Sequence, residues 1–426
     1  MPSRADLLNC IHCGFCLPAC PTYIATGQEL ESPRGRLHLI SAVLDGRISA
    51  TERVLGHLDL CLQCRACETA CPSSVPYGRI MEDARAAILA NPPAIQPRAW
   101  RGRALLLREV LARPRRLRAA LALGRLYTRS GLQAFVRGPL GATLRHVLPP
   151  TLLRLESSAP VLDRAPFRAT GLLSRPGLGS PTTRVALLLG CVQGEIYPQV
   201  HEATVRVLEH VGCAVVAPEG QGCCGALLTH AGDSETARAL ARRNIAAFER
   251  AGVEAVIVNA AGCGAAMKEY GRLLHHDRHW AERAERFSAG VRDVLEFVAA
   301  RDFAGGLGRV ERTVTLQDAC HLAHAQGIRE APRTILEAIP GLRLVEMRTP
   351  DRCCGSGGLY SFVQPGMSAQ ILDAKMADIA STGAGVICTS NPGCAMQVEA
   401  GVRRGGLDAE VRHVIEILDE AVRAGR

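Results

Sequence analysis

The chain has 426 residues, enough for two to three domains, and its hydrophobic fraction of 47% is typical of a globular protein. A charged fraction of 21% excludes a largely disordered chain. The sequence contains no run of about 18 uncharged apolar residues, so we expect no membrane-spanning helix. The formal charge is +9, yet every basic residue except Lys268 and Lys375 is an arginine, so a single arginine cluster says little about partners. Aromatic residues make up 4% and no nucleic-acid-binding module is recognised, so we expect no nucleic acid partner.

The 18 cysteines are the informative part of the composition. Residues 1–9 lack the apolar core of a secretory signal, so we expect a cytoplasmic protein. Stable disulfides are rare in that compartment. The cysteines therefore indicate metal binding or redox chemistry.

The first eight cysteines form two runs with the same spacing, C-x2-C-x2-C-x3-C, and a proline follows each run. This spacing is the known pattern of bacterial ferredoxins, in which three thiolates of a run hold one cubane cluster and the fourth reaches the other cluster. We therefore expect two [4Fe-4S] clusters with two ligand sets. Set 1 is Cys10, Cys13, Cys16 and Cys71, and set 2 is Cys61, Cys64, Cys67 and Cys20. Zinc, the alternative, normally takes two C-x2-C pairs rather than two triples that each have a trailing Cys-Pro.

Helices are predicted between and after the two runs. Pro33 can start a helix with apolar residues at helical spacing, and Gly46 can end it. A second helix is expected over 51–60 with Thr51 as its N-cap, and a third from about residue 78 to 90. A helical insert of this length does not fit a compact β-rich ferredoxin. The sequence therefore predicts an all-helical two-cluster ferredoxin module over residues 1–95.

Residues 96–182 are expected to form an arginine-rich helical linker. Leucine and alanine stretches alternate with arginines over 98–154, with helix breaks at Pro114 and Gly131. Two interpretations stay open: solvated arginines on linker helices, or a basic surface for an anionic membrane face or an acidic partner. The part over 157–183 is rich in Ser, Pro and Gly and is predicted to be an irregular connection.

An internal repeat occupies the second half of the chain, and we place its copies at 183–300 (repeat 1) and 309–426 (repeat 2). Each copy opens with an apolar strand, over 185–189 or 314–316, and then has Cys-Cys-Gly and Gly-Cys motifs. The spacings between equivalent cysteines agree to within one residue, which indicates duplication.

Strands and helices alternate within each repeat. In repeat 1, strands over 214–216 and 255–259 flank a helix over about 234–251, and helices over 291–298 and 411–418 close the two copies. This order predicts parallel sheets with helices on both faces. The fold class is therefore α + α/β, with a helical ferredoxin module, a helical linker and two duplicated cysteine-rich domains.

The cysteines of each repeat fall at the carboxyl ends of strands, where such sheets bind ligands. The repeat-1 thiols are Cys191, Cys223, Cys224 and Cys263, and the repeat-2 thiols are Cys320, Cys353, Cys354 and Cys394. Three interpretations stay open for them: an iron–sulfur cluster, a zinc ion, or free redox thiols. Cys213 and Cys388 lie in or beside apolar strands and are expected in the core. His321 and His324 are expected to cap or pack rather than to transfer protons.

The two ferredoxin runs together with the paired Cys-Cys-Gly repeats resemble the iron–sulfur subunit of bacterial glycolate oxidase (glycolate dehydrogenase). The match extends over nearly the whole chain. The segments that carry it are CIHCGFCLPACPTY, SPRGRLHLI, CLQCRACETACPS, GCCGA, AAGCGAAMKEYG, CCGSGG and TSNPGC. The resemblance implies an electron-transfer subunit whose separate FAD subunits oxidise glycolate to glyoxylate. It also implies a place at the inner face of the cytoplasmic membrane and a respiratory electron acceptor.

The repeats also resemble those of heterodisulfide reductase, the iron–sulfur subunit of anaerobic glycerol-3-phosphate dehydrogenase and lactate-utilisation proteins. The fuller motif of these relatives ends in C-x2-C, but here Ala260 and Asn391 replace the first cysteine of that pair. This departure weakens the expectation of a five-thiolate cluster and of disulfide reduction. No Gly-x-Gly-x-x-Gly follows a strand within a βαβ unit, so we expect FAD on partner subunits and not on this chain. Lactate or glycerol 3-phosphate stays open as the partner's substrate, as does an enzyme acting at the Cys-Cys-Gly sites.

Overall fold

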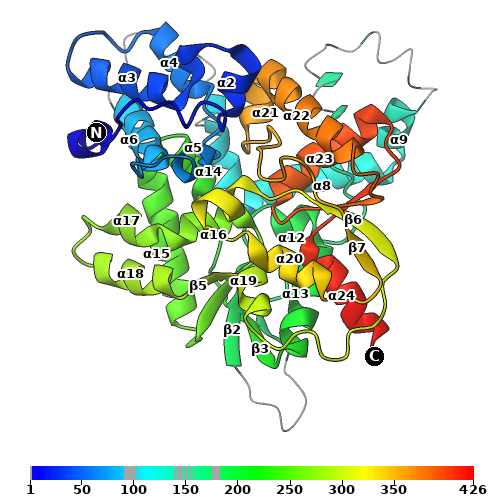
Figure 1. The fold of residues 1–426 in the computed structure, drawn as a ribbon. Coiled ribbons are helices and arrows are strands. Elements are labelled where there is room, and N and C mark those ends of the chain that lie inside the picture. Colours follow the sequence, from blue (N-terminus) through cyan, green and yellow to red (C-terminus); the bar gives the residue numbers. More distant parts are fainter. Residues whose placement is uncertain are drawn as a thin grey trace.

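The computed structural model describes residues 2–90, 102–103, 105–138, 141, 147, 149, 152–153, 156–157, 159–174 and 183–426. Figure 1 shows the helical N-terminal module, in blue, lying against the helices of both sheet-containing repeats. Helix α6 (Tyr77–Ala90) of the module contacts α14 (Ala226–His230) of repeat 1, and α2 (Pro21–Thr26) contacts α22 (Pro365–Ala380) of repeat 2. The cysteine-bearing loops of all three units lie in this region of contact, as described below.

The N-terminal module contains helices and no strands in its described part, as predicted. The helix over Pro33 begins with Ser32 as its cap, whose hydroxyl accepts the Gly35 N–H at 3.0 Å. Thr51 caps the next helix in the same way through the Val54 N–H, at 3.4 Å. The elements are α1 (Arg4–Leu8), α2 (Pro21–Thr26), η1 (Glu29–Glu31), α3 (Pro33–Leu44), α4 (Glu52–Asp59), α5 (Ala66–Thr69) and α6 (Tyr77–Ala90).

The connecting region contains η2 (Leu107–Leu111), α8 (Pro114–Arg129) and α9 (Leu132–Arg137). The predicted breaks are confirmed, because Pro114 is the first residue of α8 and Gly131 is the left-handed N-cap of α9. The boundary predicted between residues 95 and 96 lies outside the described residues. The prediction of an irregular connection over 157–183 is wrong in one place, since β1 (Gly171–Ser174) pairs antiparallel with β3 (Cys213–Ala217). Backbone pairing at the free edge of the sheet forms this strand, and its own residues carry no alternating pattern.

Repeat 1 forms a five-stranded sheet in the order β1-β3-β2-β4-β5, parallel except for β1. Val185 and Leu187 of β2 face one hydrophobic core, while Ala186 faces the other, so helices cover both faces of this sheet. The strands are β2 (Thr183–Leu187), β3 (Cys213–Ala217), β4 (Ala255–Val258) and β5 (Val291–Asp293). The helices are α12 (Gln193–Ile196), α13 (Pro198–His210), α14 (Ala226–His230), α15 (Ser234–Glu249), α16 (Ala261–Lys268), α17 (Tyr270–Leu274), α18 (Ala281–Ala289) and α19 (Val294–Ala299).

Repeat 2 forms an all-parallel sheet in the order β7-β6-β8-β9. Its strands are β6 (Arg312–Leu316), β7 (Leu342–Leu344), β8 (Val386–Cys388) and β9 (Glu410–Arg412). Its helices are η4 (His321–Ala325), α20 (Glu330–Glu337), α21 (Tyr360–Val363), α22 (Pro365–Ala380), α23 (Pro392–Gly405) and α24 (Val414–Ala424).

The closing segments of the repeats differ from the predicted single helices. Each begins with a short edge strand, β5 or β9, and the helix starts only afterwards. Asp293 is the last residue of β5 and His413 directly follows β9. They cap α19 and α24, each in a capping box with a glutamate three residues later. The capping residue marks the point where the strand ends and the helix begins. The apolar periodicity used for the prediction does not locate this point.

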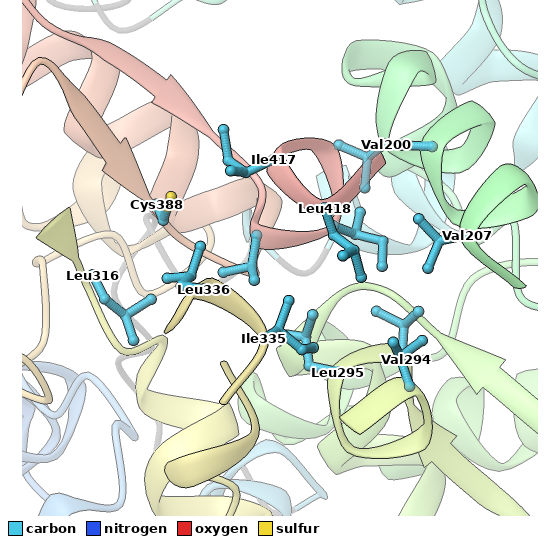
Figure 2. Packing of buried hydrophobic residues seen from close by; sticks show 14 of the residues in the cluster. Val200, Val207, Val294, Leu295, Leu316, Ile335, Leu336, Cys388, Ile417 and Leu418 are labelled. Atoms are coloured by element: carbon cyan, nitrogen blue, oxygen red, sulfur yellow. The ribbon is translucent and has the colours of Figure 1, made fainter. Parts of the chain in front are cut away.

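One hydrophobic core joins the two repeats. Figure 2 shows Val200 and Val207 of α13 facing Leu418 of α24, with Leu295 of α19 beside Ile335 of α20. These side chains are at most 2% exposed. Burial of each contributes about 1.5–3 kcal/mol, so the repeats are expected to unfold together.

Candidate iron–sulfur sites

The two ferredoxin runs share an unusual backbone. His12 and Gly14 of the first run have φ angles of 56° and 87°, and the equivalent Gln63 and Arg65 of the second run have 55° and 63°. Three of these four residues are not glycine, so the left-handed conformation costs energy at each of them. Such a repeated turn curls each run around a common centre, as a loop must do to direct successive thiols at one cluster.

The set 2 cysteines line one cavity. Cys20 comes from the first run and the other three from the second, and Arg36 and Tyr77 also line the cavity. All four cysteines are buried. The Gln63 N–H donates to the Cys61 sulfur at 3.4 Å, and the Tyr77 hydroxyl donates to the same sulfur at 3.5 Å. Four thiols with further hydrogen-bond donors suit an iron–sulfur cluster. Cys20 joins the three cysteines of the other run, as the predicted ligand set 2 requires.

Set 1 is closer to solvent. Cys10, Cys16 and Cys71 are partly buried and pack against the module's core, and the Val75 N–H donates to the Cys71 sulfur at 3.5 Å. Cys13 is the one exposed member. Burial raises the pKa of Cys16, so iron binding as thiolate would displace a proton there.

The repeat-1 thiols converge as predicted. Cys224 and Cys263 lie with their sulfurs 3.1 Å apart. Hydrogen bonding to Cys223 raises the pKa of Cys191, and a hydrogen bond from Cys191 lowers that of Cys223. Gly225, in the left-handed region, starts α14, and its N–H donates to the Cys223 sulfur at 3.4 Å.

The repeat-2 thiols form an equivalent chain. Hydrogen bonding to Cys320 raises the pKa of Cys353, and a hydrogen bond from Cys353 lowers that of Cys354. Asn391, which replaces a cysteine of the related motif, donates through Nδ2 to the Cys394 sulfur at 3.6 Å. Asn391 therefore stays next to the thiols although it is not one of them.

Set 2 and the repeat-2 thiols are in contact. Cys64, Cys320 and Cys353 belong to one buried cluster, and hydrogen bonding with Cys353 lowers the pKa of Cys64. The Tyr360 hydroxyl donates to the Leu60 carbonyl at 3.0 Å, which holds repeat 2 against the second run. The sequence predicted both sites but not their adjacency.

Repeat 1 meets the ferredoxin module through polar groups. Gln63 Nε2 and Arg85 Nη1 donate to the His230 carbonyl at 3.2 and 2.8 Å. The His230 ring stacks on His321, with ring centroids 5.2 Å apart. Burial lowers the pKa of His321 to about 3, so this ring is neutral and packs, as expected.

Burial confirms the prediction for the two remaining cysteines. Cys213 and Cys388 are fully buried core residues. The sequence interpretation missed Lys375, which is 1% exposed and donates through Nζ to the Thr349 carbonyl at 2.6 Å. Among the described residues, no group of three or more His, Cys, Asp or Glu side chains is placed to hold a single metal ion.

Comparison with known proteins identifies the parts of the chain. Residues 6–75 match a family described as a 4Fe-4S dicluster domain, and residues 185–268 and 314–399 each match a cysteine-rich domain. Residues 97–158 match the linker region of the glycolate oxidase iron–sulfur subunit. The probable glycolate oxidase iron–sulfur subunit of Bacillus subtilis (strain 168) is 42% identical over 98% of this chain and 94% of its own length. The chain belongs to the family of glycolate oxidase iron–sulfur subunits.

Two further proteins are similar. The glycolate oxidase iron–sulfur subunit of Escherichia coli (strain K12) is 34% identical over 98% of this chain and 94% of its own length. A lactate utilization protein A of an Exiguobacterium species is 31% identical over 56% of this chain and 98% of its own length. A structure of a hypothetical protein from Helicobacter pylori covers 99% of this chain and 73% of its own, with a TM-score of 0.56 and 9% identity, which shows a shared fold alone.

Membership in this family of glycolate oxidase iron–sulfur subunits decides the class of function. The chain is the iron–sulfur, electron-transfer subunit of an oxidoreductase, and its ferredoxin module carries [4Fe-4S] clusters. The zinc alternative for the first eight cysteines is thereby excluded. The predicted fold class, a dicluster module and two cysteine-rich α/β domains, is confirmed.

Proposed function

We propose that set 1 and set 2 are the ligands of the two [4Fe-4S] clusters, with Cys20 and Cys71 exchanged between the runs. The placement of Cys20 in the cavity of Cys61, Cys64 and Cys67 supports this assignment. When bound, such clusters accept and release electrons one at a time. The chain's own contribution is to hold the thiols, exclude water around set 2 and bring it against repeat 2.

The observation that carries the proposed function is the placement of the three groups of thiols. Cys10, Cys16 and Cys71 of set 1 pack against the core cluster that holds Cys61 and Cys67 of set 2, and Cys64 of set 2 is buried with Cys353. We propose that a catalytic partner with FAD oxidises glycolate to glyoxylate, which releases two electrons and two protons. The electrons then pass to this chain one at a time and leave towards a respiratory acceptor. The names of the B. subtilis and E. coli relatives support glycolate as the substrate.

The surface near Cys13 supports contact with the flavin partner. Leu8, Ile11 and Phe15 are 80%, 67% and 64% exposed, although each is apolar, and they lie within a few residues of Cys13. Exposed apolar groups of this kind mark interaction sites. We propose that the partner covers them and brings its flavin near set 1.

A second surface supports peripheral binding at the inner face of the cytoplasmic membrane. Leu123 and Leu126 of α8 are 71% and 67% exposed, and Arg115, Arg116 and Arg118 are exposed on the same helix. Apolar side chains flanked by arginines fit an anionic lipid surface. No helix in the described part of the chain is long and apolar enough to cross a membrane.

The first test is iron and acid-labile sulfide per chain, measured on anaerobically purified protein. About eight irons would mean two cubane clusters, and clearly more would mean that the repeat thiols also bind iron. A variant with Cys10, Cys13 and Cys16 changed to Ser should lose about half of the ferredoxin iron, whereas the core control Cys213→Ala should lose none. Full iron in the triple variant would refute the assignment of set 1.

The second test concerns the substrate. The chain is copurified with its flavin partner, and cluster reduction is followed by electron paramagnetic resonance after addition of glycolate, lactate or glycerol 3-phosphate. Reduction by glycolate supports the proposal. Reduction by lactate alone would favour the second candidate, a lactate dehydrogenase subunit, which the similarity to lactate utilization protein A supports.

A further inference from the structure

The segment 32–36 at the start of α3 places two arginines differently. Arg34 is partly exposed, pairs with the Glu29 carboxylate and donates through Nη1 to the His12 carbonyl at 2.9 Å. Arg36 is 1% exposed and lines the cavity of set 2. Gly35 lets the helix start press against η1, since a Cβ there would lie 2.0 Å from the Glu29 carbonyl oxygen. The segment is therefore built to bring Arg36 inside.

Every nitrogen of the Arg36 guanidinium has a partner. Nε donates to the His57 carbonyl at 2.7 Å, Nη1 to the Thr22 hydroxyl at 3.1 Å, and Nη2 to the Glu31 carboxylate at 2.8 Å. The Thr22 hydroxyl in turn lies 3.2 Å from the Cys20 sulfur. The contacts fix the cation in one position, one hydroxyl away from a set 2 thiol.

The Arg36 cation and the set 2 thiols share one enclosed space. Arg36 lines the same cavity as Cys20, Cys61, Cys64 and Cys67. The Thr22 hydroxyl joins Arg36 Nη1 to the Cys20 sulfur. The carboxylate that Arg36 contacts, Glu31, is 3% exposed and is shared with His57, whose Nδ1 lies 2.5 Å from Oε1.

We propose that Arg36 sets the reduction potential of the centre held by Cys20, Cys61, Cys64 and Cys67, and raises it above the value that burial among thiolates would give. This inference rests on the proposed ligand assignment. A reduced cluster carries one more negative charge than the oxidised one, so a fixed buried cation stabilises the reduced form. Set 1 has no buried equivalent among the described residues, because the nearby Arg34 is partly exposed whereas Arg36 is enclosed. Arg36 is thus a positioning residue that makes set 2 the better electron acceptor of the two.

The test is a redox titration of both clusters, followed by electron paramagnetic resonance. Arg36→Gln should lower one of the two midpoint potentials by at least about 59 mV. For one electron this corresponds to a tenfold change in the reduction equilibrium. Glu31→Gln, which removes the countercharge and keeps the shape, should raise the same potential. Arg36→Lys, which keeps the positive charge, should shift this potential less than Arg36→Gln does. The matched control Arg34→Gln, in the same segment, should leave the set 2 potential unchanged.

The opposite signs separate this role from a structural one, because loss of packing would not raise the potential in Glu31→Gln. If Arg36→Gln does not assemble its clusters, Glu31→Gln and Arg36→Lys still decide the matter. Unchanged potentials in variants with full iron would overturn the inference while leaving the proposed electron transfer intact. Absence of iron from the wild-type protein would instead overturn the proposed function.

Discussion

The thiol of Cys64, in the second ferredoxin run, meets the thiol of Cys353, in the Cys-Cys-Gly motif of repeat 2. Both are buried in one cluster with Cys320 and Tyr360. Two units that are far apart in the chain thereby share a single region of low dielectric, in which a charge on one thiol is felt strongly by the other. Repeat 1 has no such thiol contact with set 2 among the described residues, so the two repeats are not equivalent in this molecule.

This contact predicts an asymmetric effect of cysteine substitutions. The pKa of Cys353 is raised, so its thiol stays protonated and donates to the Cys64 sulfur. Hydrogen bonds to the cluster sulfurs favour the reduced form, so Cys353→Ala should lower the potential of that cluster by about 59 mV, which is tenfold in the reduction equilibrium. The equivalent Cys223→Ala in repeat 1 should leave it unchanged. Redox titration of the two variants is the measurement, and equal shifts would contradict the assigned contact.

The glycines of the two Cys-Cys-Gly motifs should differ in how much stability is lost when each is replaced by alanine. Gly355 has a φ angle of 84°, and a Cβ there would lie 2.7 Å from the Ser368 carbonyl oxygen, whereas at Gly225, with a φ of 85°, the nearest atom is the Ala237 Cα at 3.4 Å. Gly225→Ala should therefore cost about 1–2 kcal/mol of stability from backbone strain alone. Gly355→Ala adds a backbone clash and should cost roughly 2–4 kcal/mol. Urea unfolding of the two variants measures this difference. Equal losses of stability would show that the Ser368 backbone shifts to make room for the Cβ.

Local signals in the sequence were enough to predict much of the molecule. The helix starts at Pro33 and Thr51, the repeated cysteine spacings and the parallel strands all depend on residues near one another in the chain, and the structure confirms these elements. Long-range features were different. Strand β1 forms only because β3 offers a free edge, and Cys64 meets Cys353 only because the module docks on repeat 2. Arg36 could not be singled out, since nearly every cation in the chain is an arginine.

The caps of the closing helices predict a pH dependence. Burial raises the pKa of Asp293 to about 7, and its Oδ2 has no hydrogen-bond partner while Oδ1 accepts the Leu295 N–H. The folded state therefore binds a proton that the unfolded state has already lost above about pH 4, so stability falls as pH rises towards 7. Asp293→Asn keeps a capping oxygen without the charge. It should gain about 1–2 kcal/mol relative to wild type between pH 6 and pH 8. Urea unfolding at both values measures this, and a pH-independent difference would refute it.

The two exposed apolar surfaces should have separate roles. Leu8 lies on α1 close to Cys13, and Leu123 lies among the arginines of α8. Leu8→Asp should weaken binding of the flavin partner about tenfold, because an apolar anchor at an interface is worth more than 1 kcal/mol, and it should leave vesicle binding unchanged. Leu123→Asp should weaken binding to anionic vesicles and leave partner binding unchanged. Partner affinity and vesicle cosedimentation are measured on both variants, each serving as the control for the other. Loss of both activities in one variant would indicate a general structural effect, and loss of neither would refute the assigned surfaces.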